Sequence, residues 1–183
     1  SAEIACKAAK DRGRNRVETY YDGDQSIVRR YTDLTLIGTV RSALLDQRFR
    51  LEAQTIVPLN GAPATPKFEL LLRMRDESGR TVPPGAFLPA VERCNLSVRY
   101  DRWVIATAIE WARTHAEVFN RVARIFINLS RDSVVDPEMG EFIRQSLAAS
   151  GVDPRCIGFE TAENIAIGNL GKANALIVGL RRI

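Results

Sequence analysis

The chain has 183 residues, of which 45% are hydrophobic and 26% are charged, and its formal net charge is +4. These values are typical of a globular protein with one sizeable core. Three widely spaced cysteines without a Cys-x-x-Cys pair argue against a disulfide framework or a zinc site, and they fit a reducing, cytoplasmic setting. No apolar run approaches the ~20 residues needed to span a bilayer, so we expect no membrane segment in this chain.

Residues 1–22 predict a short helix followed by a strand. An apolar helical stripe over residues 4–9 precedes the terminator Gly13, and "RNRVETYY" has the composition of a strand. Two such elements cannot bury a core of their own, so we interpret them as the end of a unit that begins before Ser1. The stretch "YDGDQS" has the composition of a turn or linker, and we assign residues 23–30 to the linker.

A helix over about residues 27–47 is expected next, followed by the strands "RLEAQTIVPL" and "KFELLLRMR". The second strand alternates, and its even-numbered residues from 68 to 74 are apolar. The opposite face carries Glu69, Leu71, Arg73 and Arg75. A solvated sheet face explains this pattern simply, and a functional site on that face is the alternative.

The rest of the chain continues to alternate helices with strands. A short helix is expected around "AFLPAVERC", and a long helix capped by Asp101 over "RWVIATAIEWARTHAEVF". The strand "ARIFINLS" precedes a helix that begins at Asp136 and Pro137 and ends at Gly151. The strand "RCIGFE" and the helix "NLGKANALIVGLRR" complete the chain.

This order predicts an α/β fold with a largely parallel sheet, because every crossover is long enough for a helix. Glu69, Asn128 and Glu160 lie in or at the ends of predicted strands. A (β/α) barrel places its active-site residues at the carboxyl ends of strands. Four strands cannot close an eight-stranded barrel, so we expect the first half of a (β/α)8 TIM-type barrel.

His115 is the single histidine of the chain and falls on an apolar helical stripe, where we expect a structural, partly buried residue. One histidine excludes a histidine-rich metal cluster. Any bound metal would therefore have oxygen ligands, which favours magnesium, manganese or calcium.

Several segments match, in order, the motifs of one known family. "FELLLR" is similar to a Glu-Ala-Leu-Leu-Arg signature, and Gln54 before "TIVPL" is similar to a Gln-Pro-Ile-Val stretch. "PGAFLPAVE", "YDRWVI", "INLS" and "FETAEN" match further motifs. Together they resemble the EAL domain, the cyclic-di-GMP phosphodiesterase family, over residues 31–183. The opening "AAKDRGRNRVETY" resembles the last helix and strand of a GGDEF, or diguanylate cyclase, domain, which makes residues 1–22 its C-terminal remnant.

The resemblance implies a metal site and a reaction. Glu69, Asn128 and Glu160 match the family's metal-binding positions, and Glu69 is also a catalytic position. In the family, magnesium or manganese activates a water that attacks one phosphodiester of cyclic-di-GMP and gives the linear dinucleotide. Glu163 matches a catalytic-site glutamate that braces the loop carrying further ligands.

The resemblance also implies a binding site for cyclic-di-GMP. Gln54, Leu71 and Arg73 match substrate-binding positions. The guanidinium suits this role because it can fork onto two phosphate oxygens. Ala162 departs from the family motif and is expected to weaken the brace formed by Glu163.

Three functions remain open at this stage. Taken singly, Glu69, Asn128 and Glu160 are surface or turn residues, but their order favours a site. The parent protein is then an active phosphodiesterase or a degenerate, non-catalytic receptor of cyclic-di-GMP. The third possibility is a dimerisation module, because the open edges of a half-barrel invite pairing, and we expect a homodimer.

Basic residues are scattered, which argues against a nucleic acid polymer as partner. The family's later ligands, an Asp-Asp pair, a lysine and a glutamate, would lie beyond Ile183, so this chain alone is expected to be inactive.

Overall fold

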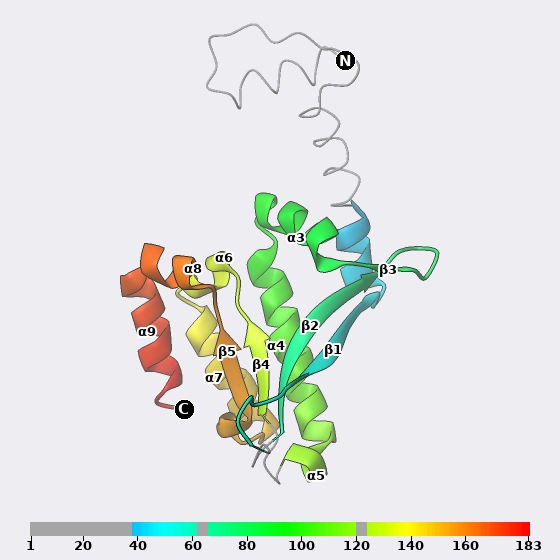
Figure 1. The fold of residues 1–183 in the computed structure, drawn as a ribbon. Helices are drawn as coiled ribbons and strands as arrows, with labels where there is room; N and C mark the ends of the chain where they lie inside the picture. The colour runs from blue at the N-terminus through cyan, green and yellow to red at the C-terminus, as the bar shows by residue number, and fades with distance from the viewer. Residues whose placement is uncertain (1–37, 62–65, 120–123) are drawn as a thin grey trace, which may run out of the picture.

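The computed structural model describes residues 38–61, 66–119 and 124–183 (Figure 1). The expected remnant over residues 1–22 and the linker over residues 23–30 lie outside the described residues. Within the described ranges, no helix is long and apolar enough to cross a bilayer.

The sheet has the order β1 (Phe49–Ile56), β2 (Lys67–Arg75), β4 (Arg124–Asn128) and β5 (Ile157–Glu160), with β3 (Thr81–Val82) paired to the end of β2. Strands β2, β4 and β5 are parallel, as predicted. β1 is antiparallel to β2, which corrects the expectation that every crossover is long enough for a helix. The connection between them spans about ten residues, and a parallel crossover needs a dozen or more.

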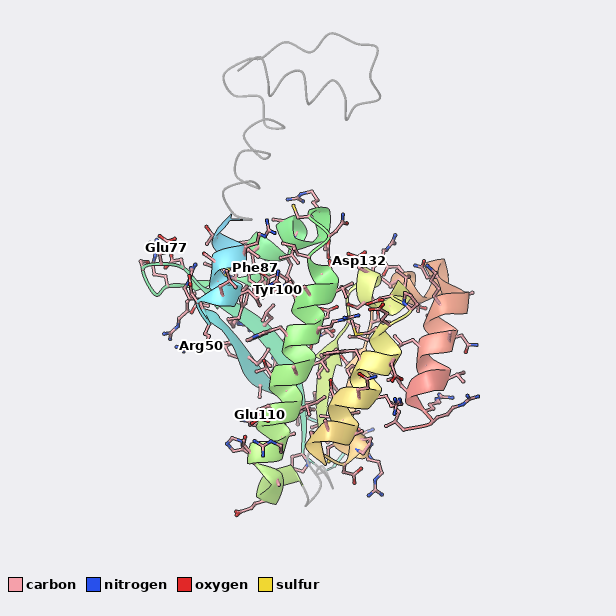
Figure 2. All side chains as sticks on the ribbon, turned by 180° about the vertical axis from the view of Figure 1, so that it is seen from behind. Arg50, Glu77, Phe87, Tyr100, Glu110 and Asp132 are labelled. Atoms are coloured by element: carbon pink, nitrogen blue, oxygen red, sulfur yellow. The ribbon has the colours of Figure 1, made fainter. Side chains whose placement is uncertain are left out.

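Helices α4 (Ser97–Thr114) and α7 (Met139–Ser150) cover one face of this sheet (Figures 1 and 2). The alternation predicted for β2 is confirmed, because Leu70 is only 6% exposed and Met74 is fully buried on the covered face. Ile127 of β4 is fully buried there too. The opposite face of the sheet is turned toward the viewer in Figure 1, and no described helix lies over it.

Short helices gather where the parallel strands end (Figure 1). They follow β4 and β5 directly, as α6 (Arg131–Val135) and α8 (Glu163–Gly168). The remaining helical segments are residues 38–45, α3 (Pro84–Arg93), α5 (Ala116–Phe119), the 3-10 turn η1 (Pro154–Cys156) and α9 (Leu170–Leu180).

Two helix starts differ from the sequence prediction. α4 begins at Ser97, so Asp101 lies inside the helix and does not cap it. α7 begins at Met139, and the Asp136 carboxylate accepts the backbone N–H of Glu138 at 3.0 Å just before it. The predicted end at Gly151 is confirmed by its left-handed φ of 71°.

His115 is exposed, which corrects the expectation of a partly buried residue. It ends α4, where its Nδ1 atom lies 2.9 Å from the carbonyl oxygen of Trp111. The helix ends at this residue, so the apolar stripe does not continue through it into the core.

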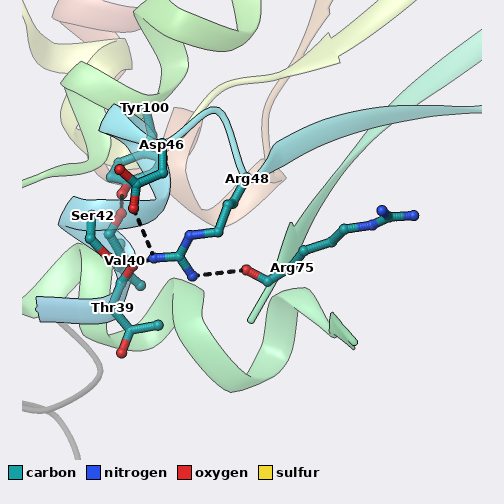
Figure 3. A network of polar contacts seen from close by, with 7 residues as sticks. All are labelled: Thr39, Val40, Ser42, Asp46, Arg48, Arg75 and Tyr100. Atoms are coloured by element: carbon teal, nitrogen blue, oxygen red, sulfur yellow. Dashed lines mark hydrogen bonds and ion pairs between the residues drawn. The ribbon is translucent and has the colours of Figure 1, made fainter. Parts of the chain in front are cut away.

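The helix over residues 38–45 is fixed to the domain by buried and polar contacts (Figure 3). The Tyr100 hydroxyl of α4 donates to the carbonyl oxygen of Val40 at 2.7 Å. Arg48 donates to Ser42 Oγ and, at 3.2 Å, to the carbonyl oxygen of Arg75 at the end of β2. The ring of Phe49 packs edge-on against Tyr100, with centroids 5.0 Å apart. This helix therefore contacts α4 through Tyr100, and Arg48 connects it to the end of β2.

Candidate functional site

The parallel register of three neighbouring strands brings the predicted metal-binding residues together. Asn128 and Glu160 end β4 and β5, whereas Glu69 is the third residue of β2, which continues to Arg75. Asn128 pairs directly with Glu160 in the β4–β5 register. Its Nδ2 atom donates to Glu69 Oε1 of β2 at 2.7 Å. The Asn128 amide thus joins β4 to the carboxylate of Glu69, and Glu160 lies beside Asn128 in β5.

Hydrogen bonds to Glu160 and Thr161 hold the residue that follows Asn128. The N–H of Leu129 donates to the carbonyl oxygen of Glu160 at 2.7 Å. The Thr161 hydroxyl donates to the carbonyl oxygen of Leu129 at 3.3 Å. Both polar groups of the Leu129 backbone are therefore satisfied by β5 and the residue after it, which is what a buried residue requires.

Arg73 lies at the carboxyl end of β2 on the same face as Glu69. Its Nε atom is 2.8 Å from Oε2 of Glu52 on β1, and a second nitrogen donates to the carbonyl oxygen of Leu72 at 3.0 Å. The Arg73 side chain is 23% exposed and the Glu52 side chain 57%. Glu52 was not predicted as a site residue, although the alternation of β1 puts it on the face of Gln54.

Gln54 and Glu69 face each other across the β1–β2 pair. In the next strand, Phe126 is the register partner of Glu69, and Gly158 is the partner of Phe126. A Cβ atom on Gly158 would lie 2.6 Å from the Phe126 ring. The absence of a side chain at residue 158 therefore makes room for that ring beside the glutamate.

A cleft of about 670 Å³ opens beside the strand ends, and Leu71, Arg73 and Asn128 line it. Glu69 and Glu160 are not among its lining residues. Its walls combine apolar side chains with charged and amide groups, as small-molecule sites do. The other lining residues are Leu70, Leu72, Pro84, Leu88, Val91, Glu92, Ser97, Tyr100, Asp101, Val104, Leu129, Ser130, Arg131, Asp132, Ala162, Asn164 and Ile165.

Glu163 is the first residue of α8, and it is exposed. The preceding residue, Ala162, occupies the N-cap position and makes no side-chain capping bond. The structure places Glu163 after the end of β5, but the hydrogen bonds of the described residues do not tie it to Glu69 or Asn128.

Asp101 also lines the cleft, and sequence reasoning assigned it to a helix cap. Its Oδ2 atom accepts the backbone N–H of Ser130 at 2.8 Å. Burial raises the pKa of this carboxyl above its usual value, and hydrogen bonds from Ser130 and Ser133 oppose that shift. No local pattern signals this role, because the partner lies 29 residues further along the chain.

The side chains of Glu69, Asn128 and Glu160 offer oxygen atoms, which are the ligand type that a hard cation prefers. Glu69 and Glu160 supply carboxylate oxygens, and the Asn128 amide also carries one oxygen. Within the described ranges, no group of three histidine, cysteine or carboxylate side chains gathers. The described residues thus offer a partial oxygen-donor set.

Fold and site together define an α/β protein with a polar site at the carboxyl ends of parallel strands. Residues 37–183 match the EAL domain, and the chain belongs to this family.

The chain is similar to two curated cyclic di-GMP phosphodiesterases. It is 29% identical to PdeB of Shewanella oneidensis over 182 residues, which is 100% of this chain and 21% of that protein. It is 28% identical to PdeF of Escherichia coli K12 over 151 residues, or 82% of this chain and 20% of that protein. The chain thus spans about a fifth of the length of these relatives.

Solved structures support the same fold. The crystal structure of the FimX EAL domain from Pseudomonas aeruginosa, bound to c-di-GMP, superposes with a TM-score of 0.73 at 30% identity. The match covers 80% of this chain and 58% of that domain. The PaMucR phosphodiesterase in complex with c-di-GMP also gives a TM-score of 0.73, at 23% identity, which supports the fold alone.

Proposed function

We propose that this chain forms part of the cyclic-di-GMP site of a phosphodiesterase, and that the full-length protein hydrolyses cyclic-di-GMP to the linear dinucleotide. The observation that carries the proposal is the approach of Glu69 in β2 to Asn128 and Glu160 at the ends of β4 and β5, with Asn128 bonded to Glu69 at 2.7 Å. The matches to PdeB and PdeF support it.

Glu69, Asn128 and Glu160 would hold Mg²⁺ or Mn²⁺ through their oxygens, with further ligands completing the set. When bound, the cation supplies positive charge that acidifies water and neutralises phosphoryl oxygens. The Asn128 side-chain amide donates through Nδ2 to Glu69 Oε1, which orients that carboxylate and leaves Oε2 to serve as the metal ligand.

Arg73 binds a phosphate of the dinucleotide in this proposal. It lies four residues from Glu69 on the same face, or about 13 Å along the strand at ~3.3 Å per residue. One elongated ligand can therefore meet both groups. Leu71 lies between them in β2, and Gln54 faces Glu69 from β1, so both would contact the same ligand.

Several finer features belong to the proposal. Residues 31–183 form the first half of a TIM-type barrel, residues 1–22 are a GGDEF remnant, and residues 23–30 link them. Glu163 braces the loop after β5. In this proposal the protein acts in the cytoplasm as a homodimer.

The test is turnover of cyclic-di-GMP by the full-length protein, with Mg²⁺ and Mn²⁺ assayed separately. Glu69→Ala should abolish formation of the linear dinucleotide. Glu77→Ala is the matched control, because Glu77 is an exposed glutamate in the turn between β2 and β3 (Figure 2). Equal turnover by both variants would contradict the proposed site.

A second function, a non-catalytic receptor of cyclic-di-GMP, is supported by Ala162, which makes no side-chain capping bond directly before Glu163. Saturable binding of cyclic-di-GMP without product in either metal would establish it. In that case Arg73→Ala should weaken binding while Glu69→Ala leaves it nearly unchanged.

A further inference from the structure

Asp101 is a carboxylate on the inner side of α4, where apolar residues are more usual. It lies in the second turn of α4, faces the cleft, and is partly buried beside the strand end of β4. Its Oδ2 atom accepts the N–H of Ser130 at 2.8 Å. A charged acceptor makes this one of the stronger kinds of hydrogen bond.

Ser130 is the junction between β4 and α6. It is the N-cap of α6, and its Oγ atom accepts the N–H of Ser133 at 3.3 Å. Ser130 Oγ also donates to Ser133 Oγ at 3.2 Å, and Ser133 is fully buried. The backbone therefore turns from strand to helix over Leu129 and Ser130, and Asp101 of α4 accepts the N–H of the second of these residues.

The two residues after Asn128 are thus pinned from opposite sides. Leu129 is bonded to Glu160 and Thr161 of the β5 side, and Ser130 is bonded to Asp101 of α4. Asn128 directly precedes these two held residues, and its side chain donates to Glu69.

We propose that Asp101 is a positioning residue that aims Asn128 at Glu69 by holding the Ser130 N–H. The inference rests on the proposed function for its effect on catalysis. The role requires a hydrogen-bond acceptor at residue 101, and it does not require a charge. Supporting groups of this kind typically contribute 10- to 100-fold to affinity or activity.

The experiment compares Asp101→Ala and Asp101→Asn in the full-length protein. The Ala variant should lower kcat about 10- to 100-fold with KM within about twofold, because substrate still meets Arg73. The Asn variant should restore kcat to within a fewfold, since its amide oxygen accepts the same N–H. Ile105→Val is the control for lost stability, because Ile105 is fully buried in the same helix. This variant should keep the kcat of the wild type.

Amide hydrogen exchange gives a readout that does not depend on catalysis. Exchange at Ser130 should accelerate in Asp101→Ala and stay slow in Asp101→Asn and Ile105→Val. Unchanged Ser130 exchange in the Ala variant would overturn the proposal, even if the wild type shows no turnover.

A loss of kcat in Asp101→Asn equal to that in Asp101→Ala would also overturn it. Catalysis would then depend on the negative charge of Asp101 and not on its role as a hydrogen-bond acceptor. Absence of wild-type turnover with the expected exchange pattern would contradict the proposed function and leave the positioning role supported.

Discussion

Arg73 and Glu52 form an ion pair across β1 and β2, with Nε and Oε2 2.8 Å apart. The pair lies on the sheet face that carries Glu69, where the proposed phosphate contact of Arg73 would also form. A ligand phosphate and Glu52 therefore compete for the same guanidinium.

Glu52→Gln should tighten binding of cyclic-di-GMP about two- to fivefold. An exposed ion pair contributes up to about 1 kcal/mol, which corresponds to roughly a fivefold change in affinity. Isothermal titration calorimetry would measure it. Glu110→Gln is the matched control, because it breaks the Glu110–Arg113 pair on the outer helix α4 (Figure 2). Weaker binding by Glu52→Gln would mean that Glu52 holds Arg73 in its binding orientation.

Gly158→Ala should destabilise the domain by about 1–3 kcal/mol, because the added Cβ would meet the Phe126 ring at 2.6 Å. Chemical denaturation would measure the free energy of unfolding. Phe126→Leu in the same chain should recover part of the loss, since a smaller side chain leaves room for the methyl group. Additive effects of the two substitutions would contradict this contact.

Asp101→Asn should raise the free energy of unfolding at neutral pH. The folded pKa of Asp101 is raised above its ordinary value of 3.8, mainly by burial, with the nearby Asp132 adding to the shift. The folded state therefore binds the carboxyl proton of Asp101 more tightly than the unfolded state does, and stability falls as the pH rises from 3.8 through the folded pKa. The amide of Asp101→Asn does not ionise, so the variant avoids this loss of stability.

The gain from Asp101→Asn should thus be present at pH 7 and absent near pH 3. Denaturation of both proteins across this range would show it. A variant that is less stable than the wild type at pH 7 would mean that the hydrogen bonds from Ser130 and Ser133 outweigh burial.

Tyr100→Phe should destabilise the domain by about 1–3 kcal/mol, because the buried carbonyl of Val40 would lose its donor. Burial raises the pKa of Tyr100 to about 12. The unfolded chain ionises this group near pH 10, so its contribution to stability is lost as the pH rises from 10 to 12.

Ultraviolet absorbance of the phenolate would check the pKa of Tyr100. One of the four tyrosines in the sequence should titrate late, and that late phase should be missing from Tyr100→Phe. An unchanged titration curve in the variant would contradict the assignment.

Local patterns were sufficient to predict most of the strands and the site-bearing face. The alternation of β2 placed Glu69 opposite the buried Leu70, and Gly151 ended α7 as expected. Patterns of this kind depend on neighbouring residues, which is why they can be read from one sequence.

What the sequence missed depends on tertiary partners. Asp101 resembles a helix cap locally, but its partner is the N–H of Ser130 in a distant segment. The Asn128–Glu69 bond joins residues 59 positions apart, and only the strand order brings them together. The antiparallel direction of β1 is likewise a property of the pairing and not of β1 itself.

The reversed direction of β1 has a consequence for any signal that arrives from upstream. Because β1 runs against β2, its first residues lie beside the last residues of β2, and Arg50 pairs with Arg73. The helix over residues 38–45 therefore joins the domain on the side of the sheet where β2 ends, next to α3 and the start of α4 (Figure 1). A shift or rotation of that helix would act on Tyr100 directly and, through Arg48, on the backbone of Arg75. Mechanical input from a preceding segment thus has a path of a few contacts to the end of β2, two residues from Arg73.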